Sequence, residues 1–301
     1  MHFAGSLALS IYLFFHGIWW LIMCTNDHFM SKIPDRTTRR KSHFTSKTWH
    51  TVPISKLPLE PILRLFSALL CAVIDLSVSG QWKLFDENGD VIANNVAGFS
   101  HATLFILFAV LAVAEIIESF RKSQLPATIL QLILSVSYLS IGLVYYQYSQ
   151  SSDSHPIAKG HARLLALIAW IASVFAACES CHPKSYPLSF GRRFLTTLQG
   201  TWLFQMSFSI FGSKKWKETQ GTKSLIALTF LWHILVLIVL CLICHGIMLC
   251  AVNRYTHKQD GIYNNYNSQR KVDEDSIPLG IVVNGNMLYE DGTSDTETLY
   301  P

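Results

Sequence analysis

Seven long runs of mostly apolar residues divide this chain of 301 residues, and they limit its fold more than any other feature. A helix that spans a membrane needs ~17–25 mostly apolar residues, because ~20 residues cover a ~30 Å hydrocarbon core. The runs therefore predict an all-α, polytopic membrane protein whose membrane domain, residues 1–252, is a bundle of seven transmembrane helices. The expected helices cover residues 3–24, 59–79, 97–118, 127–148, 157–178, 190–212 and 224–251.

The composition favours the same class and excludes others. Only 15% of the residues are charged and 50% are hydrophobic, whereas an ordinary soluble domain carries about 25% charged residues. So few charges cannot cover a soluble globule of this size, and so much apolar content excludes a chain that is disordered throughout. The net charge of +4 is spread over an apolar chain, so we expect no nucleic-acid partner.

Lysine and arginine are distributed unevenly between the connections. The connections expected on the same side of the membrane as the first loop and the tail contain 16 of the 24 Lys and Arg residues. The connections expected on the other side contain 6. Because cytoplasmic loops are enriched in Lys and Arg, we expect the N-terminus to be outside or lumenal and the C-terminus to be cytosolic. The sixth stretch is the weakest of the seven, because it contains Arg192, Arg193, Gln199 and Gln205.

Two polar segments lie on the expected cytosolic side. The first loop is basic, and residues 32–47 would contact the anionic lipids of the cytoplasmic leaflet, although these charges would equally serve only to set the topology. The tail, residues 253–301, is rich in Asn, Asp, Gly and Ser and has no helical period. We therefore expect a disordered tail, suited to sorting or adaptor contacts, in which no feature identifies a protein partner.

Polar side chains recur in the outer half of five of the expected helices. A charged group in hydrocarbon costs at least about 2.5–3.5 kcal/mol, which makes such residues candidates for a functional site. Three His and one Asp would suit zinc with an open position for water, two His on facing helices would suit a haem iron, and a hydrogen-bonded layer would stabilise the bundle without a cofactor. The candidate residues are Asp75, His101, His161, Gln205 and His233, with His2 at the head of the first helix; the metal ligands would be Asp75, His101, His161 and His233.

A second polar set lies near the expected cytosolic ends of the helices. Glu60 and Arg64 have the i,i+4 spacing of an ion pair within one helix, and Glu115 lies close to the end of the third helix. Arg192 and Arg193 would either meet these acids or extend to the headgroups. The set indicates either pairing that holds the bundle together or a path for proton-coupled transport.

Two segments, residues 178–182 and 241–245, match the pattern C-x-x-C-H. That pattern can mark haem attachment or redox chemistry. Both copies fall within or at the cytosolic ends of expected helices, where Cys usually behaves as a small apolar residue. We therefore expect neither motif to bind haem or zinc.

Residues 198–205 read Leu-Gln-Gly-Thr-Trp-Leu-Phe-Gln, and Trp232 is followed by His233. These motifs resemble the sixth-helix signature L-Q-G-T-W-x-x-Q and the seventh-helix W-H pair of the transmembrane protein 45 family. The resemblance extends over residues 1–254. It rests further on His101 with Glu115, on Glu60, Arg64 and Asp75, and on His2 with Gly5 and Ser6.

The chain departs from the family's pattern at Ser140, Gln147 and Lys159, where relatives carry a Glu and two His residues at or near these positions. A site that depends on those groups would be incomplete here. What the resemblance implies is a multi-pass protein of endomembranes (Golgi or endosome) or of the plasma membrane, with no established enzymatic activity.

The sequence leaves three functional hypotheses. It contains none of the signatures H-E-x-x-H, G-x-S-x-G or a phosphate-binding loop, each of which marks a known chemistry. We therefore expect a non-enzymatic protein that acts by interaction, in trafficking or signalling. The alternatives are a zinc- or haem-dependent membrane enzyme built on the outer polar residues, and a proton-coupled transporter that uses both polar sets.

Overall fold

The structure is a computed structural model that describes residues 3–33, 44–50, 58–80, 82–121, 126–151, 155–212 and 216–275. The described chain is helical, and one isolated β-bridge, between Phe85 and Val91, is the extended pairing found in it. The seven helices are α1 (Phe3–Met30), α2 (Leu59–Ser79), α3 (Ala93–Arg121), α4 (Ala127–Gln150), α5 (Pro156–Cys181), α6 (Tyr186–Phe211) and α7 (Gln220–Asp275).

Helices α2 to α6 begin and end within four residues of the predicted bounds, whereas α1 continues past the predicted end at residue 24 to Met30, and α7 differs most. It continues to Asp275, well past the expected end at residue 251. The helix can continue this far because no proline, which would break a helix, occurs from Gln220 until Pro278. The expected irregular tail is thus helical as far as Asp275, and its remaining residues, 276–301, lie outside the described residues.

Prolines determine where several helices begin. Pro58 and Pro126 immediately precede α2 and α4, and Pro156 and Pro187 occupy the first turns of α5 and α6. Proline suits these positions because its missing N–H would have no partner in the first turn and its φ is already helical. Gly80 ends α2 in the left-handed conformation, with φ of 63°, which a residue without a Cβ adopts at little cost.

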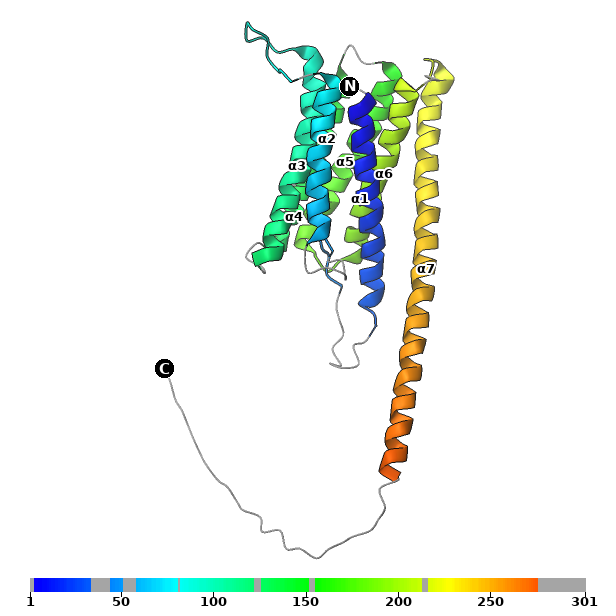
Figure 1. The fold of residues 1–301 in the computed structure, drawn as a ribbon. Coiled ribbons are helices and arrows are strands. Elements are labelled where there is room, and N and C mark those ends of the chain that lie inside the picture. Colours follow the sequence, from blue (N-terminus) through cyan, green and yellow to red (C-terminus); the bar gives the residue numbers. More distant parts are fainter. Residues whose placement is uncertain are drawn as a thin grey trace, which may run out of the picture. The chain divides into compact units, whose positions relative to one another are not determined.

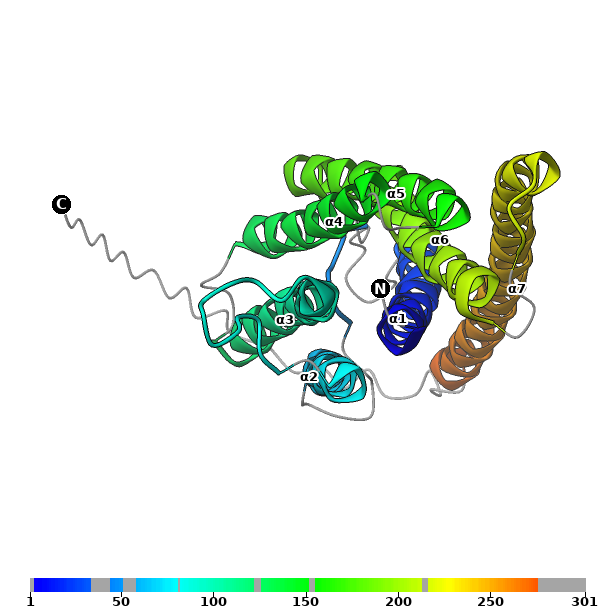
Figure 2. The same ribbon diagram turned by 90° about the horizontal axis from the view of Figure 1, so that it is seen from above.

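Helices α1 to α6 form a closed ring. Each packs against the next along the chain, and α6 returns to pack against α1 (Figure 2). The α4–α5 contact is close because α5 presents a line of buried alanines, and small residues are typical of helix interfaces in membranes. These alanines are Ala158, Ala162, Ala166, Ala169, Ala172 and Ala176.

The part of α7 that ends at Asn253 lies outside the ring, beside α6 and α1 (Figures 1 and 2). It forms none of the close helix pairs of the described chain, and only 11% of its most apolar stretch is buried, against 50% in α3 and α5. Aromatic side chains attach it instead: Phe230 packs edge-on against Trp202 of α6 at 5.0 Å between ring centroids. His245 accepts a hydrogen bond from the Tyr186 hydroxyl at 2.6 Å.

Six of the described helices, all except α6, are long and apolar enough to cross a membrane. Large apolar side chains face outward, such as Leu63, Phe66 and Val78 on α2, each at least 64% exposed. Outward faces of this kind are typical of a protein whose solvent is lipid. Helix α6 is more polar than these six spans. Its buried polar residues, among them Arg192, Arg193 and Gln199, lie inside the bundle, where α1 and α5 flank the helix.

Candidate functional site

At one end of the ring, where α2 ends and α3 begins, four helices place polar groups together. We call this the outer end. His101 Nδ1 of α3 lies 3.7 Å from Asp75 Oδ2 of α2, and both side chains are buried. The Tyr145 ring of α4 stacks on His101 at 6.0 Å between centroids. Gly5 of α1 makes room for this pair, because a Cβ there would lie 2.1 Å from Asp75 Oδ1.

His161 and His233 occupy a different place, on either side of Trp202. The buried His161 ring stacks on the Trp202 ring at 4.9 Å, and the His233 ring meets it edge-on at 5.7 Å. Trp202 Nε1 also donates to the His161 carbonyl at 3.0 Å, and His161 Nδ1 donates to the Ile157 carbonyl at 2.9 Å. Local hydrogen bonds thus hold His161 and Trp202, and both imidazoles pack against the indole ring.

The predicted four-residue metal site is therefore not assembled. Within the residues that the structure describes, no group of three or more His, Cys, Asp or Glu side chains is placed to hold a metal ion. Asp75 and His101 meet each other on α2 and α3, whereas His161 and His233 meet Trp202 on α6, so the four residues form two separate pairs. Gln205 is half-buried on α6, and His2 lies outside the described residues.

The opposite end, where α1, α3 and α5 finish, contains a denser network of charges. We call this the inner end. Arg64 of α2 is fully buried and pairs with two carboxylates, Glu60 one turn before it and Glu115 of α3. Trp20 of α1 donates from Nε1 to Glu60 Oε1 at 2.8 Å, and its ring lies 4.5 Å from the Arg64 guanidinium. The three residues predicted as an inner set are thus brought together.

A second buried ion cluster lies between α5 and α6. Arg192 donates from Nε to Glu179 Oε2, and Arg193 Nη1 lies 3.7 Å from Glu179 Oε1. The two arginines therefore meet an acid of α5, rather than the acids of α2 and α3 or the headgroups. The Arg192 guanidinium lies 5.6 Å from the Trp20 ring, so this indole contacts an arginine from each cluster.

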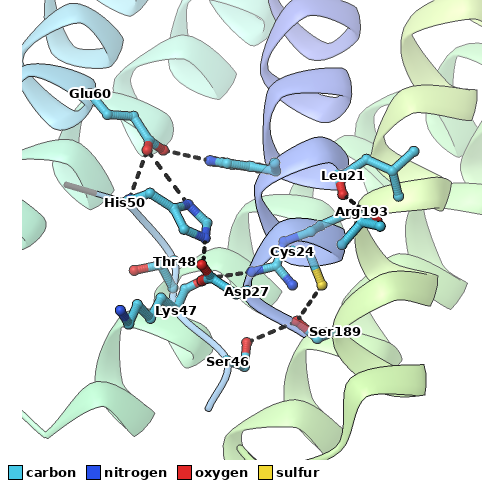
Figure 3. A network of polar contacts seen from close by, with 12 residues as sticks. Leu21, Cys24, Asp27, Ser46, Lys47, Thr48, His50, Glu60, Ser189 and Arg193 are labelled. Carbon is cyan, nitrogen blue, oxygen red and sulfur yellow. Dashed lines mark hydrogen bonds and ion pairs between the residues drawn. The ribbon is translucent and has the colours of Figure 1, made fainter. Parts of the chain in front are cut away.

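Residues 44–50, which we call the 44–50 segment, are inserted into this end of the ring (Figure 3). Ser46, Thr48 and His50 are buried, and the residues between them are more exposed, which is the alternation of an extended chain. The His50 side chain lies between Glu60 and Asp27, with Nε2 3.2 Å from Asp27 Oδ2.

The backbone of the 44–50 segment is also bound by the ring. Arg193 donates to the Lys47 carbonyl at 2.6 Å, His50 N donates to Glu60 Oε2 at 2.8 Å, and Ser46 N donates to the Pro183 carbonyl at 2.7 Å. The side chains that pair with one another therefore also fix this segment in place.

In its chemistry the inner end is a set of paired charges. Three buried arginines face three buried glutamates, an arrangement that avoids the cost of an unpaired ion in a medium of low dielectric. Each glutamate lies against at least one arginine, although Glu115 Oε1 has no hydrogen-bond partner among the described residues. These ion pairs link helices α2 and α3 and helices α5 and α6 at this end of the bundle.

Several residues of the inner end could not be identified from the sequence. No sequence pattern marks Trp20 as a partner of Glu60. Glu179 lies within a C-x-x-C-H motif, which indicates a role for its cysteines and its histidine but none for the glutamate. The 44–50 segment alternates buried and exposed residues, but its buried residues are polar, so no hydrophobic periodicity reveals it. Of the predicted lipid-contact loop, residues 34–43 lie outside the described residues.

Comparison with known proteins gives one family. A model described as a family of unknown function (DUF716) matches residues 127–246. The matched part runs from α4 into α7 and includes the Trp202 cluster with His161 and His233, as well as the Glu179–Arg192 pair.

Proposed function

We propose that this protein is a seven-span integral membrane protein of the transmembrane protein 45 type that acts without catalysis, by interaction, in trafficking or signalling. The proposal rests on the inner end. There the buried arginines and glutamates pair with one another and bind the 44–50 segment. Such a network favours one conformation, and it pairs each of its three buried acids with an arginine.

Seven spans follow if α6 crosses with the others. It runs through the ring between α1 and α5, and its 26 residues are long enough for a ~30 Å hydrocarbon core. Charged residues within a membrane face the bundle interior and pair there, as Arg192 and Arg193 do with Glu179. The excess of Lys and Arg then favours a cytosolic inner end and tail, with the N-terminus outside or lumenal.

Helix α7 supports an interaction role by its length. Its 56 residues would extend ~84 Å at 1.5 Å per residue, whereas ~20 residues suffice to span the hydrocarbon. The polar second half therefore has to lie in water, where it would present a surface to soluble partners. Endomembranes (Golgi or endosome) or the plasma membrane are the compartments we propose.

Topology mapping in cells tests the membrane placement. Glycosylation acceptor sites would be added singly before Phe3, in the 82–92 loop, in the 44–50 segment and after Asp275. We expect glycans at the first two positions only. A glycan on the chain after Asp275, or both ends on one face, would overturn the proposed seven-span orientation.

Proximity labelling tests the interaction role. Biotin ligase would be fused after residue 275 in one chain and after residue 253 in a chain that lacks the polar half of α7. We expect a reproducible set of trafficking or signalling proteins to be enriched by the longer chain at least tenfold over the shorter one, a factor that ~1.4 kcal/mol of affinity provides. Identical labelling by both chains would contradict a role for this helix.

A further inference from the structure

A cavity of about 260 Å³ lies at the inner end, between the 44–50 segment and the ends of two helices. Residues 45–49 form one wall, and Glu118 of α3 with Leu130 and Gln131 of α4 form the other. It is separate from the paired arginines described above, since none of them lines it.

The cavity sits at the level where two spans end. The apolar spans of α3 and α4 cover Asn95–Phe120 and Thr128–Gln150, so Glu118 and Gln131 each lie within one turn of a span end. In a bilayer of ~30 Å hydrocarbon thickness, that level is the headgroup region. A molecule bound here would therefore come from the membrane interface.

The lining carries groups for both signs of charge. The half-buried Glu118 carboxylate accepts from Trp49 Nε1 at 3.0 Å, and a carboxylate beside an indole is a site for an ammonium group. Lys47, whose side chain is exposed, and the Thr45 hydroxyl supply donors suited to a phosphate.

One lining group is unusual for a buried residue. Gln131 is 1% exposed, and its Oε1 has no hydrogen-bond partner among the described residues. A buried amide oxygen without a partner costs free energy, which a donor on a bound molecule would recover. A primary ammonium group in the cavity supplies that donor and also carries the positive charge that the Glu118 carboxylate favours.

We infer that this cavity binds the zwitterionic headgroup of a membrane phospholipid with a primary ammonium group, of the phosphatidylethanolamine type, with its ammonium at Glu118 and Trp49 and its phosphate at Lys47. The volume lies below the ~300–1,000 Å³ of pockets for whole drug-sized ligands, so it suits a headgroup whose acyl chains remain outside. Exposed apolar side chains on the same two helix ends, Phe120 and Leu132, offer surface to those chains. The inference rests on the membrane placement proposed above.

Native mass spectrometry of the full chain from mixed nanodiscs tests this site. The discs would contain equal amounts of phosphatidylethanolamine and phosphatidylglycerol, which share the phosphate, whereas only the first has an ammonium group. We expect the wild-type protein to retain phosphatidylethanolamine about tenfold more than phosphatidylglycerol, and Glu118→Gln to abolish that preference. Equal retention by the wild type, or an unchanged preference in Glu118→Gln, would overturn the inference.

Three controls separate the site from general effects. Glu87→Gln makes the same change on an exposed residue of the 82–92 loop and should keep the preference. Trp49→Phe keeps an aromatic ring but removes the indole N–H, and it should reduce the preference even if Glu118→Gln fails to fold. Displacement of the lipid by free phosphoethanolamine at equal concentration would overturn a lipid as the occupant. Retention in symmetric discs does not depend on orientation, so a reversed topology in cells would be recognised separately.

Discussion

Arg64 is fully buried between the carboxylates of Glu60 and Glu115. We predict that Arg64→Leu lowers the free energy of unfolding by about 3–5 kcal/mol, because it leaves two buried acids facing each other without a cation. The measurement is thermal unfolding of the purified protein in detergent. Arg163→Leu is the matched control, since Arg163 is exposed on α5, and it should change stability little. A comparable loss in both variants would show that the buried pair is not the cause.

For single residues, the sequence predicted contacts within one helix better than contacts between helices. Glu60 and Arg64 pair because their spacing lies along one helix, which the sequence reveals directly. The contact of Asp75 with His101 and the separation of both from His161 depend on how each helix is rotated about its axis. A soluble helix reveals that rotation by its apolar stripe, but a helix in lipid is apolar on both its buried and its outward faces. The sequence therefore gave no basis for dividing the outer set between α2–α3 and the Trp202 cluster.

Glycine controls the approach of two helices, α1 and α6. A Cβ on Gly200 would lie 2.5 Å from the Phe14 backbone nitrogen, and backbone cannot rotate away as a side chain can. We predict that Gly200→Ala forces the helices apart and costs about 1–3 kcal/mol of stability, the usual range for overpacking. In α7, Gly246 has nothing within 4 Å of a built Cβ. Gly246→Ala should therefore be neutral or gain up to about 1 kcal/mol from helix propensity. Thermal unfolding of both variants checks the difference, and equal effects would refute the close approach.

The 44–50 segment depends on side chains that reach it from the ring. Arg193 donates to the Lys47 carbonyl at 2.6 Å, so we predict that Arg193→Gln increases the rate of backbone hydrogen exchange over residues 44–50 by about tenfold, the factor that a loss of about 1.4 kcal/mol produces. Exchange measured by mass spectrometry on the detergent-solubilised protein reports this segment. The exchange of α4, which Arg193 does not hold, serves as the internal reference. Unchanged exchange at residues 44–50 would mean that this bond does not restrain the segment.

For the whole molecule, the apolar runs predicted the helical class and the approximate bounds of six helices, because the length of a membrane span is fixed by the bilayer. They did not predict the closed ring of α1 to α6, which follows from which side of each helix packs. They also did not predict α7 beyond residue 251, where local polarity favoured an irregular tail. The order of the helices in the ring depends on contacts between residues that are far apart in the sequence, such as Gly17 and Thr197.

The chain divides into two units, residues 1–253 and 254–301, and we expect the first unit to fold on its own contacts. We predict that a chain ending at Asn253 keeps the melting temperature of the full protein, because the ring, both ion clusters and the 44–50 segment all lie before that residue. The measurement is thermal unfolding of the two purified chains in the same detergent. Ending the chain at Leu225 instead removes the Phe230 and His233 contacts to Trp202 and should destabilise it, which provides the positive control. If loss of residues 254–301 were as damaging as loss of the apolar part of α7, the polar half of that helix would have a structural role in the bundle, and the interaction role proposed for it would lose its support.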